Sequence, residues 1–182
     1  DGVVVDISDE VSDFSLYSPE MLMKKADIRK GDILIINTGY HKYGWDQPKA
    51  DEVRYMVKHP GPDAAFHKWA QEMKFKWIGV DCGSADHPMN TILRDWHPKL
   101  FAKAEAKLKE THGKGWDEYY PPDEYYQVMH LKMFPMGIVH AENLGGDIDQ
   151  LKNKRTWIGL FPWRAIELES CISRIVAFEF DK

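Results

Sequence analysis

Cysteine is scarce in this 182-residue chain, which contains only Cys82 and Cys171. Two cysteines far apart in the sequence do not make a disulfide framework, so we expect a reducing compartment and a cytoplasmic location. No apolar run approaches the roughly 20 residues that cross a bilayer, and no signal peptide is visible. We therefore expect no membrane partner.

Positive charge is also in short supply. The chain has 24 Lys and Arg residues against 29 Asp and Glu residues, which gives a net charge of -5. A nucleic-acid-binding protein usually presents a basic face, so we expect no nucleic-acid partner. Hydrophobic residues make up 43% of the chain, which is typical of a folded protein, and the length suits one domain.

The chain does not begin with Met. It opens at Asp1 and enters a β-branched run at Val3. A strand so close to the first residue predicts that the chain is the processed or ordered remainder of a longer polypeptide. An artificial boundary is the alternative interpretation.

Apolar runs and helix-capping patterns predict the order of the elements. Strands are expected at residues 3–7, 33–36, 77–81, 138–139, 157–168 and 173–180, the last two antiparallel. Helices are expected at 19–26, from 60–63 onward, at 100–111 and at 124–134, with loops at 40–60 and 113–123. Strands first alternate with helices and then follow one another. This pattern predicts an α/β single domain with a mixed β-sheet and flanking helices.

His130 and Glu142 are the most informative pair of polar residues. The expected helix, the turn at Gly137 and the return strand bring the two side chains together, although they are 12 residues apart in the sequence. Imidazole and carboxylate are ordinary ligands of Zn²⁺ and Mn²⁺. On spacing alone, however, a surface or capping pair is the simpler interpretation.

Four segments carry a family resemblance. Residues 31–39 read GDILIINTG, 78–86 read IGVDCGSAD, 130–144 read HLKMFPMGIVHAENL, and 147–151 read DIDQL. They resemble, in the same order, the motifs G-D-x-V-L-I-x-T-G, I-G-V-D-x-x-S-x-D, H-x-x-L-L-x-x-G-I-x-I-x-E-x-L and N-L-D-x-L. These motifs are those of the cyclase family of metal-dependent hydrolases, which includes kynurenine formamidase and isatin hydrolase.

The resemblance implies a swivelling β/β/α cyclase-like fold over residues 1–182. His130 and Glu142 match metal-ligand positions of the family, so a divalent metal, Zn or Mn, and a small-molecule substrate are expected. The implied activity is hydrolysis of an amide, formamide or lactam C–N bond by a metal-activated water. Two alternatives stay open. One is a non-catalytic subunit or binding module of the same fold, and the other is a lactone or ester hydrolase.

Asp86 and Ser84 follow a buried strand, and we predict them as catalytic residues that orient a ligand or a water. Simple turn chemistry explains them equally well. His87 and His140 are predicted to contact substrate. His87 lies close after the strand, and His140 shares a face of an alternating strand with Glu142.

An aromatic-rich insertion is expected at about residues 89–127, and its Trp116 is a predicted substrate-binding residue. Its aromatic side chains suit a pocket for a planar substrate or a subunit contact. A surface subdomain with its own small core is the slightly preferred interpretation.

The family signature H-x-G-T-H-x-D-x-P-x-H has no counterpart in these 182 residues. In the family it supplies two His and one Asp as metal ligands and a His implicated in acid–base chemistry. We therefore expect a separate or cleaved N-terminal polypeptide that supplies the remaining metal ligands. The resemblance further implies a homo-oligomer.

Overall fold

A mixed sheet organises the computed structural model, which describes residues 1–164 and 166–179. Within these residues the main sheet has six strands in the order β6-β5-β3-β1-β7-β8. Four are parallel neighbours and two are antiparallel. Their bounds are β1 (Gly2–Asp6), β3 (Ile33–Asn37), β5 (Trp77–Val80), β6 (Val139–Ala141), β7 (Arg155–Pro162) and β8 (Ser173–Phe178).

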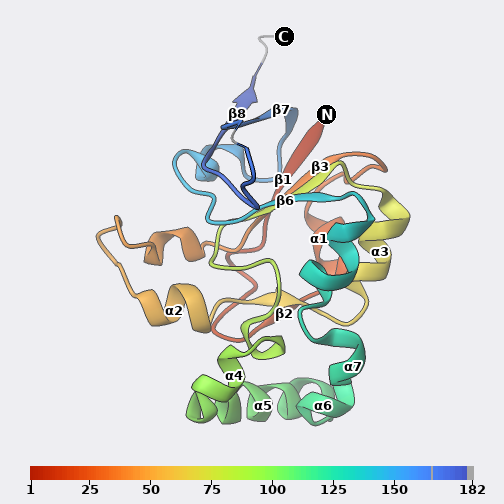
Figure 1. Cartoon of the computed structure of the whole chain (residues 1–182), viewed down its shortest axis with the longest axis vertical. Helices are drawn as coiled ribbons and strands as arrows, with labels where there is room; N and C mark the ends of the chain where they lie inside the picture. Colours follow the sequence, from red (N-terminus) through yellow and green to blue (C-terminus); the bar gives the residue numbers. More distant parts are fainter. Residues whose placement is uncertain (165, 180–182) are drawn as a thin grey trace.

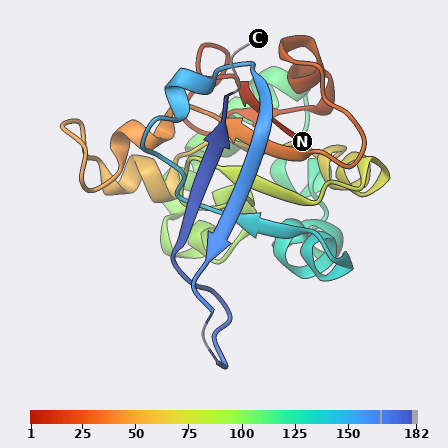
Figure 2. The ribbon, with the colours of Figure 1, turned by 90° about the horizontal axis from the view of Figure 1, so that it is seen from above.

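Both faces of the central strands are covered, which explains their continuous apolar runs. On one face, Val3 and Leu34 pack against helices α1 (Pro19–Lys25) and α3 (Phe66–Met73). On the other face, Val4 packs with residues of the 144–151 segment and with Ile158 of β7. Figure 2 shows that β7 and β8 lie across the parallel strands, so the sheet curls over this second face.

Short helices gather at the end of the molecule opposite the β7–β8 hairpin (Figure 1). They are α4 (Leu93–Trp96), α5 (Pro98–His112), α6 (Trp116–Tyr119) and α7 (Pro122–Tyr125). The Tyr120 hydroxyl donates to the carbonyl of Pro62 at 2.8 Å. Pro62 belongs to β4 (Gly61–Pro62), which pairs in parallel with β2 (Leu16–Tyr17). Trp116, Tyr120 and Tyr125 thus join the main core and do not build a separate one.

The expected strands are present with shifted ends. The expected strand at 157–168 is too long, because β7 ends at Pro162. Residues 165 and 180 lie outside the described part of the chain. The expected loop at 40–60 contains the 3₁₀ turn Tyr40–Tyr43 and helix α2 (Glu52–Val57), and the expected loop at 113–123 contains α6. Asp51 caps α2 by accepting from the Arg54 amide, a local pattern that the sequence does contain.

The expected helix at 124–134 is wrong as one continuous helix. α7 ends at Tyr125, and Gln127 has a φ of 44°, in the left-handed region that breaks a helix. A π-helical turn (Met129–Met133) and a 3₁₀ turn (Phe134–Met136) follow. The helix expected to start at 60–63 starts instead at Phe66, since Gly61 and Pro62 form β4.

In the described part of the chain, no helix combines the length and the apolar character needed to cross a membrane.

Gly61 tests the packing between β4 and the segment after β5. A Cβ at this position would lie 2.5 Å from the Cα of His87 and 2.9 Å from its backbone nitrogen. Because these are backbone atoms, Gly61→Ala must displace one of the two segments. We expect denaturant unfolding to show a loss of about 1–3 kcal/mol. Gly145→Ala is the control, since a Cβ there meets nothing within 4 Å. Equal stability of the two variants would contradict this packing.

Candidate functional site

Polar residues follow the parallel strands at one edge of the sheet. Asn37 ends β3, Asp81 follows β5, and Glu142 follows β6. Because these strands are parallel, their carboxyl ends meet at the same edge, where open α/β sheets place their functional groups. The predicted metal ligand Glu142 therefore lies at this edge of the sheet, together with Asn37 and Asp81.

His130, His140 and Glu142 form one group of half-buried side chains at this edge. One ligand atom from each residue lies within 4.8 Å of the other two. The Nε2 atom of His130 lies 3.4 Å from Oε1 of Glu142. The two predicted metal ligands are thus neighbours, and His140 lies beside them.

Asp86 holds the His130 ring. Its carboxylate is 1% exposed and accepts from Nδ1 of His130 at 2.7 Å. It also accepts from the backbone amides of Met129 at 2.9 Å and His130 at 3.3 Å. The hydrogen bond that His130 donates to the Asp86 carboxylate raises the pKa of His130. With Nδ1 committed to Asp86, Nε2 is the nitrogen that remains for a ligand.

Ser84 and Ala85 hold Glu142. The Ala85 amide donates to Oε1 of Glu142 at 2.7 Å, and the Ser84 hydroxyl donates to the same atom at 3.3 Å. The Ser84 hydroxyl accepts from the Asp86 amide at 3.2 Å. Asp86 and Ser84 therefore stand behind the group and orient it. The geometry supports positioning roles for the two residues that we predicted as catalytic.

His140 lies flat against Phe134. The two ring centroids are 3.9 Å apart with an interplanar angle of 4°, and the His140 ring is 4.9 Å from that of His130. Burial lowers the pKa of His140. The neutral imidazole is the form that binds metals.

His87 and Trp116 are not brought to this group as binding residues. Each is 1% exposed, and their rings pack together with centroids 4.8 Å apart. Nδ1 of His87 accepts from the Met89 amide, while the Trp116 indole donates to Asn90. The prediction that both contact substrate has no support from these positions, because packing of the 89–127 segment against the core covers them.

His41 forms a second histidine–carboxylate arrangement that the sequence reasoning missed. Its Nδ1 lies 2.8 Å from Asp81 Oδ2 and its Nε2 lies 3.3 Å from Asp149 Oδ2. The hydrogen bond to Asp81 raises the pKa of His41. Asp81 also accepts from the amide and hydroxyl of Thr38 at 2.8 and 2.6 Å. Thr38, Asp81 and Asp149 all belong to the recognised motifs, and that shared membership was the available clue.

Tyr55 and Asn143 border the group and were also missed. The Tyr55 hydroxyl, from α2, donates to the Asn143 side chain at 2.9 Å. Asn143 directly follows Glu142 and has a φ of 61°. Burial raises the pKa of Tyr55, so the phenol keeps its proton. Helix α2 therefore forms one side of the site.

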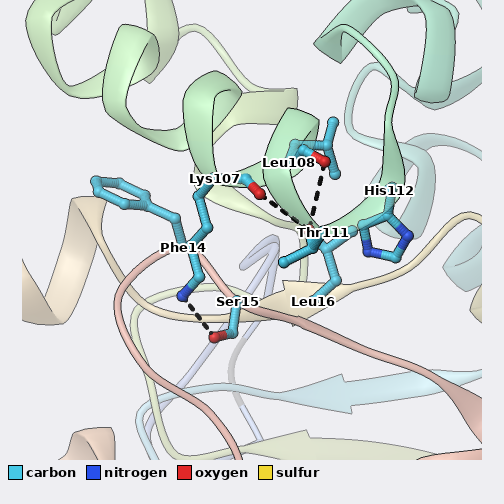
Figure 3. Close-up of a pocket in the computed structure, with 7 residues that line it drawn as sticks. All are labelled: Phe14, Ser15, Leu16, Lys107, Leu108, Thr111 and His112. Carbon is cyan, nitrogen blue, oxygen red and sulfur yellow. Dashed lines mark hydrogen bonds between the residues drawn. The ribbon is translucent and has the colours of Figure 1, made fainter.

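A separate pocket of about 110 Å³ lies between residues 14–16 and α5 (Figure 3). Its lining residues include none of the His130 group. Lys107 at this pocket donates to Ser12, Ser15 and the Asp13 carbonyl. These three bonds use all the donors of an ammonium group, so Lys107 closes the loop and offers nothing further to a ligand.

Comparison with known proteins confirms the predicted resemblance. The family model described as "Putative cyclase" matches residues 1–87. This match includes the motifs at 31–39 and 78–86 and ends before His130. No curated protein sequence matches the chain.

Solved structures share the fold. An isatin hydrolase bound to the product analogue thioisatinate has a TM-score of 0.63 at 16% identity, covering 96% of this chain and 58% of its own. Isatin hydrolase A from Ralstonia solanacearum has a TM-score of 0.63 at 18% identity, covering 97% and 58%. A potential metal-dependent hydrolase with cyclase activity has a TM-score of 0.58 at 12% identity, covering 100% and 65%.

These similarities confirm the expected mixed α/β cyclase-like fold with flanking helices. At such identities they show the fold alone. The chain spans 58% of the length of both isatin hydrolases.

Two buried histidines predict acid sensitivity. Burial lowers the pKa of His59 to about 4 and that of His87 to about 3. In the unfolded chain both titrate near about 6.5. Below that pH the unfolded chain binds protons that the folded chain excludes. These two residues therefore stabilise the fold fully above about pH 6.5, and this contribution is lost as pH falls toward about 4.

The acid-sensitivity test compares variants, because His41 and His130 have raised pKa values and act in the opposite direction. The negative charges of Asp81 and Asp86 act to raise the pKa of His59. The positive charges of His59 and Lys107 act to lower the pKa of His87. We expect His59→Gln to flatten the fall in unfolding free energy between about pH 6.5 and about pH 5, measured by urea titration. A slope identical to that of the wild type would contradict the assignment.

Proposed function

We propose that this chain belongs to a metal-dependent hydrolase that cleaves an amide, formamide or lactam C–N bond of a small-molecule substrate. His130 and Glu142 hold a divalent metal, Zn or Mn, in this proposal. One observation carries it: Nε2 of His130 lies 3.4 Å from Glu142 Oε1 while a buried carboxylate holds the opposite ring nitrogen.

The side chains fit a metal. Metal-binding histidines almost always donate their second ring N–H to a carboxylate, carbonyl or water, as His130 does to Asp86. Two ligand atoms on a tetrahedral ion with bonds of about 2.1 Å are separated by about 3.4 Å. The His130–Glu142 distance of 3.4 Å matches that separation.

When bound, a divalent ion at this point would polarise a carbonyl group and make water a better nucleophile near neutral pH. The chain's own residues prepare for it. Asp86 fixes the tautomer of His130, and Ser84 and Ala85 fix the Glu142 carboxylate. Tyr55 and Asn143, which share a hydrogen bond beside Glu142, are the polar groups that we propose contact the substrate amide.

The proposal extends to partners. The family signature H-x-G-T-H-x-D-x-P-x-H, which carries further metal ligands in the family, has no counterpart in these 182 residues. Together with the motif resemblance, this supports a separate or cleaved N-terminal polypeptide that brings further ligands. A homo-oligomer is supported by exposed apolar side chains on and beside the β7–β8 hairpin, among them Trp163 at 75% and Ile172 at 81% exposure.

Removal of either ligand tests the function. We expect purified wild-type protein to retain Zn or Mn by elemental analysis, and His130→Ala and Glu142→Ala to lose it. Hydrolysis of a panel of amides, formamides, lactams, lactones and esters should fall by several orders of magnitude in both variants. His112→Ala, an exposed histidine on α5, is the matched control. Wild-type protein with neither metal nor activity would favour the binding-module alternative.

Asp86 provides a graded test. Asp86→Asn removes the charged acceptor for Nδ1 of His130 but leaves an amide oxygen for the backbone donors. We expect metal affinity, measured against a competing chelator, to fall about 10- to 100-fold. Circular dichroism should stay unchanged. Ser84→Ala removes one of the bonds to Glu142 and should cost less. An Asp86→Asn affinity equal to that of the wild type would show that Asp86 serves the turn alone.

A further inference from the structure

We infer that His140 is a third metal ligand, so that residues of this chain alone form a His-His-Glu site. The inference rests on the proposed function for its catalytic meaning. Its metal-binding content can be measured independently of any substrate.

The position of His140 on β6 supports the inference first. His140 and Glu142 are two residues apart along an extended segment, so their side chains leave the same face. The His130 ring reaches this face from the π-helical turn before β6, with its centroid 4.9 Å from that of His140. Residues from two separate elements thus converge on one point.

The required movement is small. Ligand atoms of the three residues lie within 4.8 Å of one another, whereas a tetrahedral ion needs about 3.4 Å between them. An approach of about 1.4 Å at most therefore closes the site. The Phe134 ring lies flat against His140 and restricts the orientations open to the imidazole.

Hydrogen bonding sets His140 apart from its neighbours. Asp86 accepts from Nδ1 of His130, and Asp81 holds Nδ1 of His41. Within residues 1–164 and 166–179, neither ring nitrogen of His140 makes a hydrogen bond to another residue. The imidazole is half-buried beside a carboxylate and a second imidazole and still has both nitrogens available. A metal ion is the partner that this arrangement suits.

The identity of residue 140 is also a departure from the cyclase pattern. The motif G-I-x-I-x-E has Ile at the position two residues before the Glu, and this chain has His. An imidazole contributes less than Ile to strand packing, so a ligand role gives the substitution a chemical reason. The resulting donor set favours Zn over Mn, because imidazole suits Zn whereas Mn prefers carboxylate and water.

Two histidines and one glutamate are among the ligand sets that hold catalytic zinc with one position open for water. In this arrangement the 182-residue chain binds the metal without a ligand from any other polypeptide. Further ligands from another segment would then complete the coordination shell or hold a second ion, without being needed for the first.

The test uses the 182-residue chain and Co²⁺ or Zn²⁺ as the probe. We expect one ion per chain for the wild type, with the d–d absorption of low-coordinate Co²⁺. His140→Ile, which restores the motif residue and suits a strand, should weaken binding by more than about tenfold, because loss of outer partners alone costs that much. His112→Ala should bind as the wild type does.

A second variant, His140→Cys, distinguishes loss of a ligand from misfolding, because it is expected to gain an absorption band. His140→Cys should bind Co²⁺ with a thiolate-to-cobalt charge-transfer band that is absent from the wild type. The inference is overturned if His140→Ile binds like the wild type and His140→Cys shows no such band. If the His140 variants give this result and His130→Ala nevertheless loses the metal, the proposed function stands without His140 as a ligand. A wild-type chain that binds no metal would overturn the inference, whereas the activity assays above decide the function.

Discussion

The buried carboxylate of Asp86 joins the segment after β5 to Met129 and His130, which are 43 and 44 residues further along the chain. A carboxylate with 1% exposure is costly unless donors surround it, and here two backbone amides and an imidazole do so. These bonds fix the π-helical turn at Met129–Met133 and, with it, the direction of the His130 ring. Without an oxygen acceptor at residue 86, the amides of Met129 and His130 would lose the hydrogen bonds that they make there.

A buried aspartate that holds the Nδ1 atom of a histidine occurs twice after β5. Asp81 is fully buried and pins His41 at 2.8 Å, and Asp86 pins His130 at 2.7 Å. Between them, Ser84 and Ala85 hold Glu142. One segment of six residues therefore positions side chains from three other segments. This arrangement suits a site whose groups must be held rigidly, because the residues that hydrogen-bond to metal ligands decide how well those ligands are oriented.

The sequence predicted what depends on local patterns and burial. β1, β3 and β5 were visible because strands covered on both faces are continuously apolar. The pair His130 and Glu142 was predicted from a motif, and the turn expected at Gly137 is present, with a φ of 92°. His140 was noticed because alternation along a strand puts it on the face of Glu142.

The sequence failed where distant contacts decide the structure. The π-helical turn bonds to Asp86, and the Gln127 amide donates to the Asn90 carbonyl. No pattern within residues 124–134 reveals either contact. His87 and Trp116 looked available because their loops are polar and aromatic, yet packing of the 89–127 segment buries both. The two carboxylate partners of His41 are 40 and 108 positions away in the sequence, so no local pattern around His41 indicates them.

The candidate site divides between the two halves of the chain. Residues 1–87, which the cyclase model matches, contain Asp86 and Ser84, and the later half contains His130, His140 and Glu142. In the proposed site the first half contributes the supporting residues and the second half contributes the proposed ligands, so neither half forms the site alone. Pairing of β6 with β5 brings them together, with His140 in register with Ile78. Formation of this edge of the sheet and assembly of the site are therefore one event. If β6 separates from β5, Glu142 loses the donors Ser84 and Ala85. At the same time His130 loses the Asp86 carboxylate.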